Sequence, residues 1–240
     1  MPIELELKLA TKPEQISHIK QWLGERFGTS LEWQRSELIN TYYDTENQRL
    51  RELKIGLRVR RNGENYLQTV KSDGRVVGGL HQRNESESPI PNANLDLQMV
   101  EDPYLQILLE EAQDEDGALR PLFRTDFTRQ KILVTEDGAE IEIALDVGEI
   151  SHKGDKTSIC ELELELVSGE AKAIFELGTK LIEEFSLVLS AESKAELGYR
   201  LCSDEQKHLK RLDVVPLTAK SPAEGSFETI AHYGLEHWQH

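Results

Sequence analysis

The chain has 240 residues, and its 28 Lys and Arg against 44 Asp and Glu give a formal net charge of -16. This charge argues against general binding to nucleic acids or anionic membranes, because both require a basic surface. Its two cysteines, Cys160 and Cys202, form neither a disulfide framework nor a zinc motif, and no segment resembles a leader peptide or reaches transmembrane length. We therefore expect a cytoplasmic protein without nucleic-acid or membrane partners, and the sequence does not predict its oligomeric state.

The first predicted element is a β-strand at residues 3–9, in which Glu4, Glu6 and Lys8 share one side and apolar residues share the other. A helix over 12–28 follows, because apolar residues recur there at helical spacing. Further helices are expected over 102–112 and 170–185. The remaining strands are expected at 31–44, 55–61, 65–72, 76–87, 122–135, 139–150 and 157–167.

Three turn signals organise these strands. Asn62-Gly63, Asp73-Gly74 and Asp137-Gly138 each stand between β-type segments and predict hairpins. About eight antiparallel strands result, which is the number at which a small barrel closes. We therefore predict an α+β domain over 1–204, an eight-stranded antiparallel β-barrel tunnel with a charged lumen and flanking helices.

The C-terminal part differs from this domain. Residues 205–222 are polar, contain two prolines and predict a linker, whereas residues 223–240 have apolar side chains at helical spacing. We expect them to begin a helical region that is cut short here. A helix that folds back on the domain is an equally good interpretation.

The polar faces of the predicted strands separate by sign. Ordinary solvated faces mix charges, because neighbouring like charges repel each other. The acidic faces carry Glu4 and Glu6; Glu140, Glu142 and Asp146; and Glu161, Glu163 and Glu165. The basic faces carry Arg58 and Arg60, Lys71, Arg83, and Arg129 and Lys131.

Faces of one sign favour a bound ligand. Carboxylates from two strands suit a hard divalent cation, and guanidinium and ammonium groups suit phosphate oxygens. These faces fit an inside-out barrel whose charges line the lumen, since its apolar faces would then pack against helices. The alternative is a conventional barrel with the charged faces turned to solvent.

Ordered motifs carry a resemblance to a known family. IELELK at 3–8, GLRVR at 56–60, TVK at 69–71, ALD at 144–146, CELELEL at 160–166 and SK at 193–194 together resemble the CYTH superfamily, the triphosphate tunnel metalloenzymes. VGGLHQR at 77–83, LFRTDF at 122–127 and IEIALD at 141–146 look most like the bacterial inorganic triphosphatases. In many of these a helical CHAD domain follows, and residues 223–240 look like that junction.

The resemblance implies hydrolysis of inorganic triphosphate to pyrophosphate and phosphate, with Mg²⁺ or Mn²⁺ as cofactor. The resemblance implies that Asp146, Glu85 and Lys8 are the catalytic residues. The metal ligands would be Glu4, Glu6, Glu161, Glu163 and, with lower rank, Glu165. The groups that hold triphosphate would be Lys8, Arg58, Arg60, Lys71, Arg83, Arg129 and Lys194, with Lys131 added because its strand face fits. Glu142 likewise fits the site only by its face.

Several alternatives stay open. The same scaffold serves an adenylate cyclase or a thiamine, nucleoside or RNA triphosphatase, and a non-catalytic module that binds polyphosphate is a rival of another class. Among single residues, Lys8, Glu85 and Glu142 could be surface residues, and Lys194 could only cap a helix. His81 is better explained as a satisfied hydrogen-bonding residue than as a base.

Overall fold

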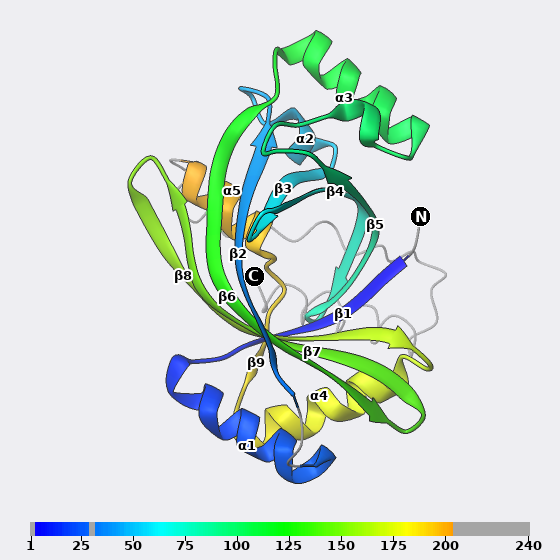
Figure 1. Ribbon diagram of the computed structural model, residues 1–240, viewed down its shortest axis with the longest axis vertical. Helices are drawn as coiled ribbons and strands as arrows, with labels where there is room; N and C mark the ends of the chain where they lie inside the picture. The colour runs from blue at the N-terminus through cyan, green and yellow to red at the C-terminus, as the bar shows by residue number, and fades with distance from the viewer. Residues whose placement is uncertain (1–2, 29–31, 204–240) are drawn as a thin grey trace, which may run out of the picture. The chain divides into compact units, whose positions relative to one another are not determined.

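The strands of the computed structural model form a closed ring (Figure 1), and the structure describes residues 3–28 and 32–203. Their order is β5-β4-β3-β2-β6-β7-β8-β1, and β1 also pairs with β5, so eight antiparallel strands close the barrel. The two-residue β9 extends the sheet beyond β1. The strands are β1 Ile3–Ala10, β2 Gln34–Asp44, β3 Gly56–Asn62, β4 Asn65–Val77, β5 Leu80–Ile90, β6 Arg120–Glu136, β7 Ala139–His152, β8 Asp155–Ser168 and β9 Val188–Leu189.

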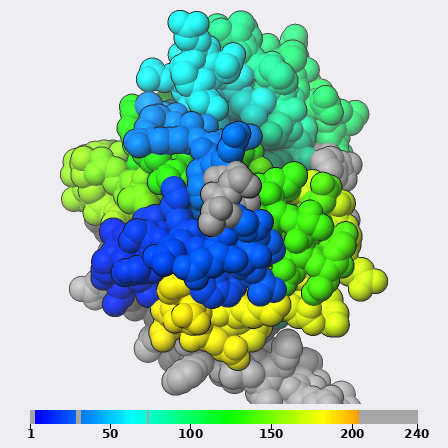
Figure 2. Space-filling model, turned by 60° about the horizontal axis from the view of Figure 1, so that its bottom comes forward, coloured from blue at the N-terminus to red at the C-terminus, as the bar shows by residue number. Residues whose placement is uncertain are grey.

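Two helices cover the outer apolar faces of β1, β7 and β8. They are α1, Ile16–Phe27, and α4, Lys172–Phe185, which lie side by side across the lower face of the molecule (Figure 2). Leu9, Ile143 and Leu164 from the strands pack with Leu177 from α4, and all four are fully buried. The apolar faces of these strands therefore turn outward into a helical layer, as the inside-out barrel requires, and the conventional barrel is wrong.

A second apolar cluster lies at the opposite end of the molecule (Figure 1), where α2, Arg49–Glu52, and α3, Pro103–Asp116, pack with residues of β3 and β4. The carboxylate of Asp102 accepts hydrogen bonds from the first turn of α3 and caps it. This helix confirms the prediction at 102–112 and extends it by one turn.

The last described helix, α5, Lys194–Cys202, packs against the inner side of the barrel. Its Tyr199 makes an edge contact with Phe123 of β6, at a centroid distance of 5.3 Å, and Phe123 stacks on Tyr42 of β2 at 4.5 Å. Gly198 lies directly against the Phe123 ring, where a Cβ would meet ring atoms at 2.1 Å. The absence of a side chain at 198 therefore lets α5 approach the strands closely.

Two of the three predicted hairpin turns are confirmed. The third, at Asp73-Gly74, is wrong, because β4 continues to Val77 through an irregular register between Ser72 and Arg75. The chain turns instead at Gly78-Gly79, where both φ angles are positive. A further hairpin at Lys153-Gly154, which also has positive φ angles, was not predicted.

The remaining sequence predictions concern the cysteines, membrane segments and the tail. Cys160 and Cys202 are both free thiols, as expected. None of the helices in the described ranges has the length and apolar character needed to cross a membrane. The predicted linker at 205–222 and helical region at 223–240 lie outside the described residues, so the domain boundaries stay a prediction.

Candidate active site

The lumen of the barrel contains a cavity of about 870 Å³ that is lined mainly by charged side chains. Thirteen of the fifteen residues predicted for the site line it: Glu4, Glu6, Lys8, Arg58, Arg60, Lys71, Arg83, Glu85, Arg129, Lys131, Glu163, Glu165 and Lys194. The other two, Asp146 and Glu161, are buried beside Glu163. One closed barrel thus brings together side chains that are up to 190 positions apart in the sequence.

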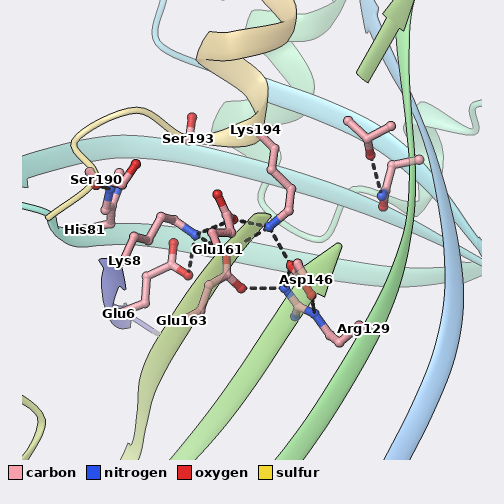
Figure 3. Close-up of polar contacts among 12 residues, drawn as sticks. Glu6, Lys8, His81, Arg129, Asp146, Glu161, Glu163, Ser190, Ser193 and Lys194 are labelled. Carbon is pink, nitrogen blue, oxygen red and sulfur yellow. Dashed lines mark hydrogen bonds and ion pairs between the residues drawn. The ribbon is translucent and has the colours of Figure 1, made fainter. Parts of the chain in front are cut away.

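Strand register determines which charges meet. Lys8 on β1 stands opposite Glu163 on β8, and Arg129 on β6 stands opposite Asp146 on β7. Direct cross-strand partners point to the same face of a sheet, so each pair enters the lumen together. Lys194 reaches the same point from the first turn of α5 (Figure 3).

The deepest charges form what we call the floor cluster: Lys8, Arg129, Asp146, Glu161, Glu163 and Lys194 (Figure 3). Arg129 makes a two-point contact with Asp146, with Nε–Oδ1 and Nη2–Oδ2 distances of 2.8 and 2.6 Å. Lys194 Nζ lies 2.6 Å from Asp146 and 3.0 Å from Glu163, and it also pairs with Glu161. Lys8 pairs with Glu163 and lies 2.9 Å from Glu6. Three basic groups therefore balance three carboxylates.

This compensation keeps two of the three carboxylates, Glu163 and Asp146, ionised, whereas burial raises the pKa of Glu161. Burial opposes ionisation of Glu163, but Lys194, Lys8 and Arg129 together lower its pKa well below the usual value. Burial also opposes the charge on Asp146, whose pKa is nonetheless lowered by Lys194 and Arg129. The floor is thus a set of buried ion pairs in which each charge depends on its neighbours.

Nearer the end of β8, three glutamates stand side by side on neighbouring strands, and we call them the acidic row. Glu165 of β8 is the direct partner of Glu6 on β1 and of Glu142 on β7. Glu165 makes no ion pair with any residue that the structure describes, and burial together with Glu4, Glu142 and Glu6 raises its pKa to about 7. The acidic row therefore has an excess of negative charge that the floor cluster does not have.

Two groups of carboxylates could hold a metal ion. Oxygen atoms of Asp146, Glu161 and Glu163 lie within 4.8 Å of one another, but the basic members of the floor cluster already occupy them. Glu4, Glu6 and Glu165 line the cavity and repel one another. Carboxylate oxygens are the donors that hard divalent cations prefer, so both groups fit such an ion by their chemistry, although Glu4 and Glu6 are also paired, with Lys71 and Lys8.

The other wall of the cavity is basic. Lys71 Nζ lies 2.6 Å from Glu4 and 3.3 Å from Glu85, and Arg58 lies 3.5 Å from Glu85. Lys131 Nζ lies 2.6 Å from Glu142. These contacts place Glu142 in the cavity, although the sequence supported it only by its face.

Arg83 is held by a neutral partner. Its Nη2 lies 3.1 Å from Nδ1 of His81, whose Nε2 lies 3.0 Å from the carbonyl oxygen of Ser190. Since a carbonyl only accepts, Nε2 carries the proton and Nδ1 accepts from Arg83. Burial, Lys8 and Arg83 lower the pKa of His81 to about 4, so the imidazole is neutral and satisfied, as the sequence interpretation expected.

Sequence reasoning missed some cavity residues. Tyr42 and Phe127 line the cavity, and buried Asn40 supports one of its arginines. Asn40 and Tyr42 alternate along a strand that was predicted correctly. Pairing that strand with 55–61 would have shown that they share the face of Arg58 and Arg60.

Comparisons with known proteins agree with this geometry. The family model of the CYTH domain matches residues 2–199. An inorganic triphosphatase of Haemophilus influenzae is 36% identical over 202 residues, which are 84% of this chain and 56% of the relative. The chain thus spans little more than half the length of this curated relative.

Solved structures share the fold at low identity. A candidate adenylyl cyclase from Hippeastrum, described as having a dominant triphosphatase activity, has a TM-score of 0.57 at 18% identity, covering 82% of this chain and 95% of its own. A candidate adenylate cyclase from Bacillus halodurans has a TM-score of 0.54 at 16% identity, covering 82% and 98%. At these identities the likeness shows the fold alone.

Proposed function

The chain belongs to the CYTH domain family, and from this premise we propose that it hydrolyses inorganic triphosphate to pyrophosphate and phosphate inside the barrel. The similarity to the inorganic triphosphatase of Haemophilus influenzae supports this substrate. Longer polyphosphates are a second ligand to test, since they present the same phosphate groups. A cytoplasmic location stays a prediction.

One observation carries the proposal. Basic side chains from six different elements converge on one cavity that also contains clustered carboxylates. A site that only bound a polyanion would gain nothing from those carboxylates, because they repel phosphate. Together the two signs suit a phosphate chain that is held by Lys and Arg and carries a divalent cation.

We propose Mg²⁺ or Mn²⁺ as the cofactor, held by Glu4, Glu6 and Glu165 with Glu163 at the boundary of the floor cluster. Glu161, which is buried beside Glu163, would help to position this set of ligands. The bound ion would neutralise phosphate charge and polarise phosphate oxygens.

The other side chains of the cavity would bind the phosphates and stabilise charge. Phosphoryl transfer asks a protein mainly for positioning and charge neutralisation. Arg58, Arg60, Lys71, Arg83 and Lys131 would hold the phosphates along the cavity wall. Lys8, Arg129 and Lys194 would stabilise charge at the floor, and Asp146, which is fully buried, would orient Arg129 and Lys194.

Glu85 is the acidic residue best placed to handle water. It lines the cavity between Arg58 and Lys71, whereas Asp146 does not reach the cavity surface. Glu85 would accept a proton from the attacking water while that oxygen bonds to the terminal phosphorus. The phosphoanhydride bond breaks and its electron pair leaves with pyrophosphate.

The test is phosphate release from inorganic triphosphate, ATP and thiamine triphosphate at equal concentration, each with Mg²⁺, with Mn²⁺ and with chelator. Metal-dependent release that is fastest with inorganic triphosphate supports the proposal. Faster release from ATP or thiamine triphosphate would assign another substrate to the same cavity. Binding of triphosphate without any release would make the protein a binding module.

A further inference from the structure

Arg60 resembles Arg83 in being held by a neutral side chain, and it differs in this from the three basic residues of the floor cluster. Lys8, Lys194 and Arg129 each pair with carboxylates, whereas Arg60 makes no ion pair with any residue in the described part of the chain. Burial, Arg58 and Arg129 lower its pKa to about 10, so its surroundings are positive. It still carries its charge at neutral pH, and that charge is not balanced locally.

The side chain that holds Arg60 is neutral. Nε of Arg60 donates to Oδ1 of Asn40 over 2.9 Å, and Nδ2 of Asn40 donates to Oγ1 of Thr125 over 2.8 Å. Because an arginine side chain can only donate hydrogen bonds, the side-chain amide of Asn40 must turn its oxygen toward Arg60. Asn40 and Thr125 are both fully buried, so neither amide nor hydroxyl can turn to water instead.

Strand register makes this chain of contacts rigid. Asn40 on β2 is the direct partner of Arg60 on β3 and of Thr125 on β6, so the three side chains form one row across three strands. Asn40 uses only the Nε–H of Arg60. The two terminal amino groups have no partner among the described side chains and remain for a two-point contact with an oxyanion.

We propose that Asn40 is a positioning residue, which fixes Arg60 through a neutral acceptor and so presents an unbalanced guanidinium to a phosphate group of the substrate. An aspartate at this position would hold the same geometry but would neutralise the charge. The inference rests on the proposed function, because it assigns Arg60 to triphosphate.

The deciding variant is therefore Asn40→Asp. The carboxylate keeps an acceptor for Arg60, and the Thr125 hydroxyl can rotate to donate to its second oxygen. Asn94→Asp is the matched control, because Asn94 is exposed on a loop outside the cavity and the variant adds the same charge. We would measure the KM for triphosphate hydrolysis, the Kd of inorganic triphosphate in chelator by calorimetry, and the thermal midpoint.

We expect Asn40→Asp to raise both KM and Kd by about tenfold or more, with a thermal midpoint equal to or above that of the wild type. Asn94→Asp should change neither constant. If Asn40→Asp binds and hydrolyses triphosphate as Asn94→Asp does, the inference is wrong. A wild-type protein that neither binds nor hydrolyses triphosphate would instead overturn the proposed function.

A second comparison covers the case in which Asn40→Asp lowers the thermal midpoint. In an Arg60→Gln background there is no guanidinium to neutralise, so adding Asn40→Asp should cause less than about a twofold further change in KM. A full tenfold change in that background would show that Asn40 acts independently of Arg60 and would refute the positioning role.

Discussion

Lys8 and Glu163 are direct partners on β1 and β8, and their side chains form a buried ion pair at the floor of the barrel. Glu163 also contacts Arg129 and Lys194. One carboxylate therefore joins β1, β6 and α5, and its charge serves both the stability of the barrel and the site.

Replacing that carboxylate should be costly. Glu163→Gln keeps the shape but leaves three buried basic groups short of one negative charge, and we expect the free energy of unfolding to fall by about 3 kcal/mol. Urea denaturation measures this. Glu176→Gln is the control, because Glu176 pairs with Lys172 on the exposed side of α4 and should cost less than about 0.5 kcal/mol. Equal losses in the two variants would contradict the role of the floor cluster.

Glu4→Gln should separate activity from stability. Lys71 keeps Glu85 as a partner at 3.3 Å, and the change removes one of the charges that repel Glu165, so little stability should be lost. The proposed metal set loses a ligand, so we expect the hydrolysis rate to fall by roughly a hundredfold or more. Glu140→Gln, an exposed carboxylate on β7, is the control for both measurements. A near-normal rate would remove Glu4 from the metal set.

His81 should make stability depend on pH. Because its pKa is about 4 in the folded protein against an ordinary 6.5, the unfolded chain binds a proton more readily, so stability present above pH 6.5 is lost as pH falls toward 4. His81→Asn keeps an oxygen near the Nδ1 position and removes this titration. Urea unfolding at pH 7 and pH 4.5 should show that the wild type loses roughly 1–3 kcal/mol more than the variant.

The matching control for this experiment is His18→Asn, since His18 is exposed on α1. It should lose as much stability as the wild type between the two pH values. If His81→Asn does so too, His81 is not a buried neutral imidazole.

Two glycine substitutions should act in opposite directions. Gly198→Ala places a Cβ 2.1 Å from the Phe123 ring, so α5 must shift, and we expect a loss of stability and, because α5 carries Lys194, a loss of activity. Gly24→Ala in α1 meets nothing within 4 Å and should stabilise by about 0.5–1 kcal/mol through helix propensity. Thermal unfolding compares them. A Gly198→Ala variant as stable as Gly24→Ala would show that α5 does not need this close approach.

The periodicity of the sequence was sufficient to predict the barrel and most of the site, because both depend on side chains that alternate between the two faces of a strand. Every second residue of β1 and β8 enters the lumen, so Glu4, Glu6 and Glu163 could be placed from spacing. Spacing does not give the register between strands. Whether Lys8 meets Glu163 or Glu165 depends on pairing across more than 150 positions, and the ion pairs could not be predicted.

The errors have local causes. Asp73-Gly74 has the residues of a hairpin turn, but the two adjacent glycines Gly78 and Gly79 adopt positive φ angles without strain and take the turn instead. The helix α5 was not predicted because only nine residues form it, and its apolar side meets aromatic residues from distant strands. Asn40 gave no signal of its own, since its role appears only when β3 lies beside it.

The place of β1 between β5 and β8 has a consequence for biosynthesis. The ribosome makes β1 first, yet Glu6 has its cross-strand partners at His81 and Glu165. One edge of β1 can pair with β5 once residue 84 has been made, but the other edge, which includes Lys8, stays unpaired until β8 has emerged. A nascent chain released before β8 would therefore expose two unpaired edges, which makes such fragments prone to aggregation and to degradation by cellular proteases.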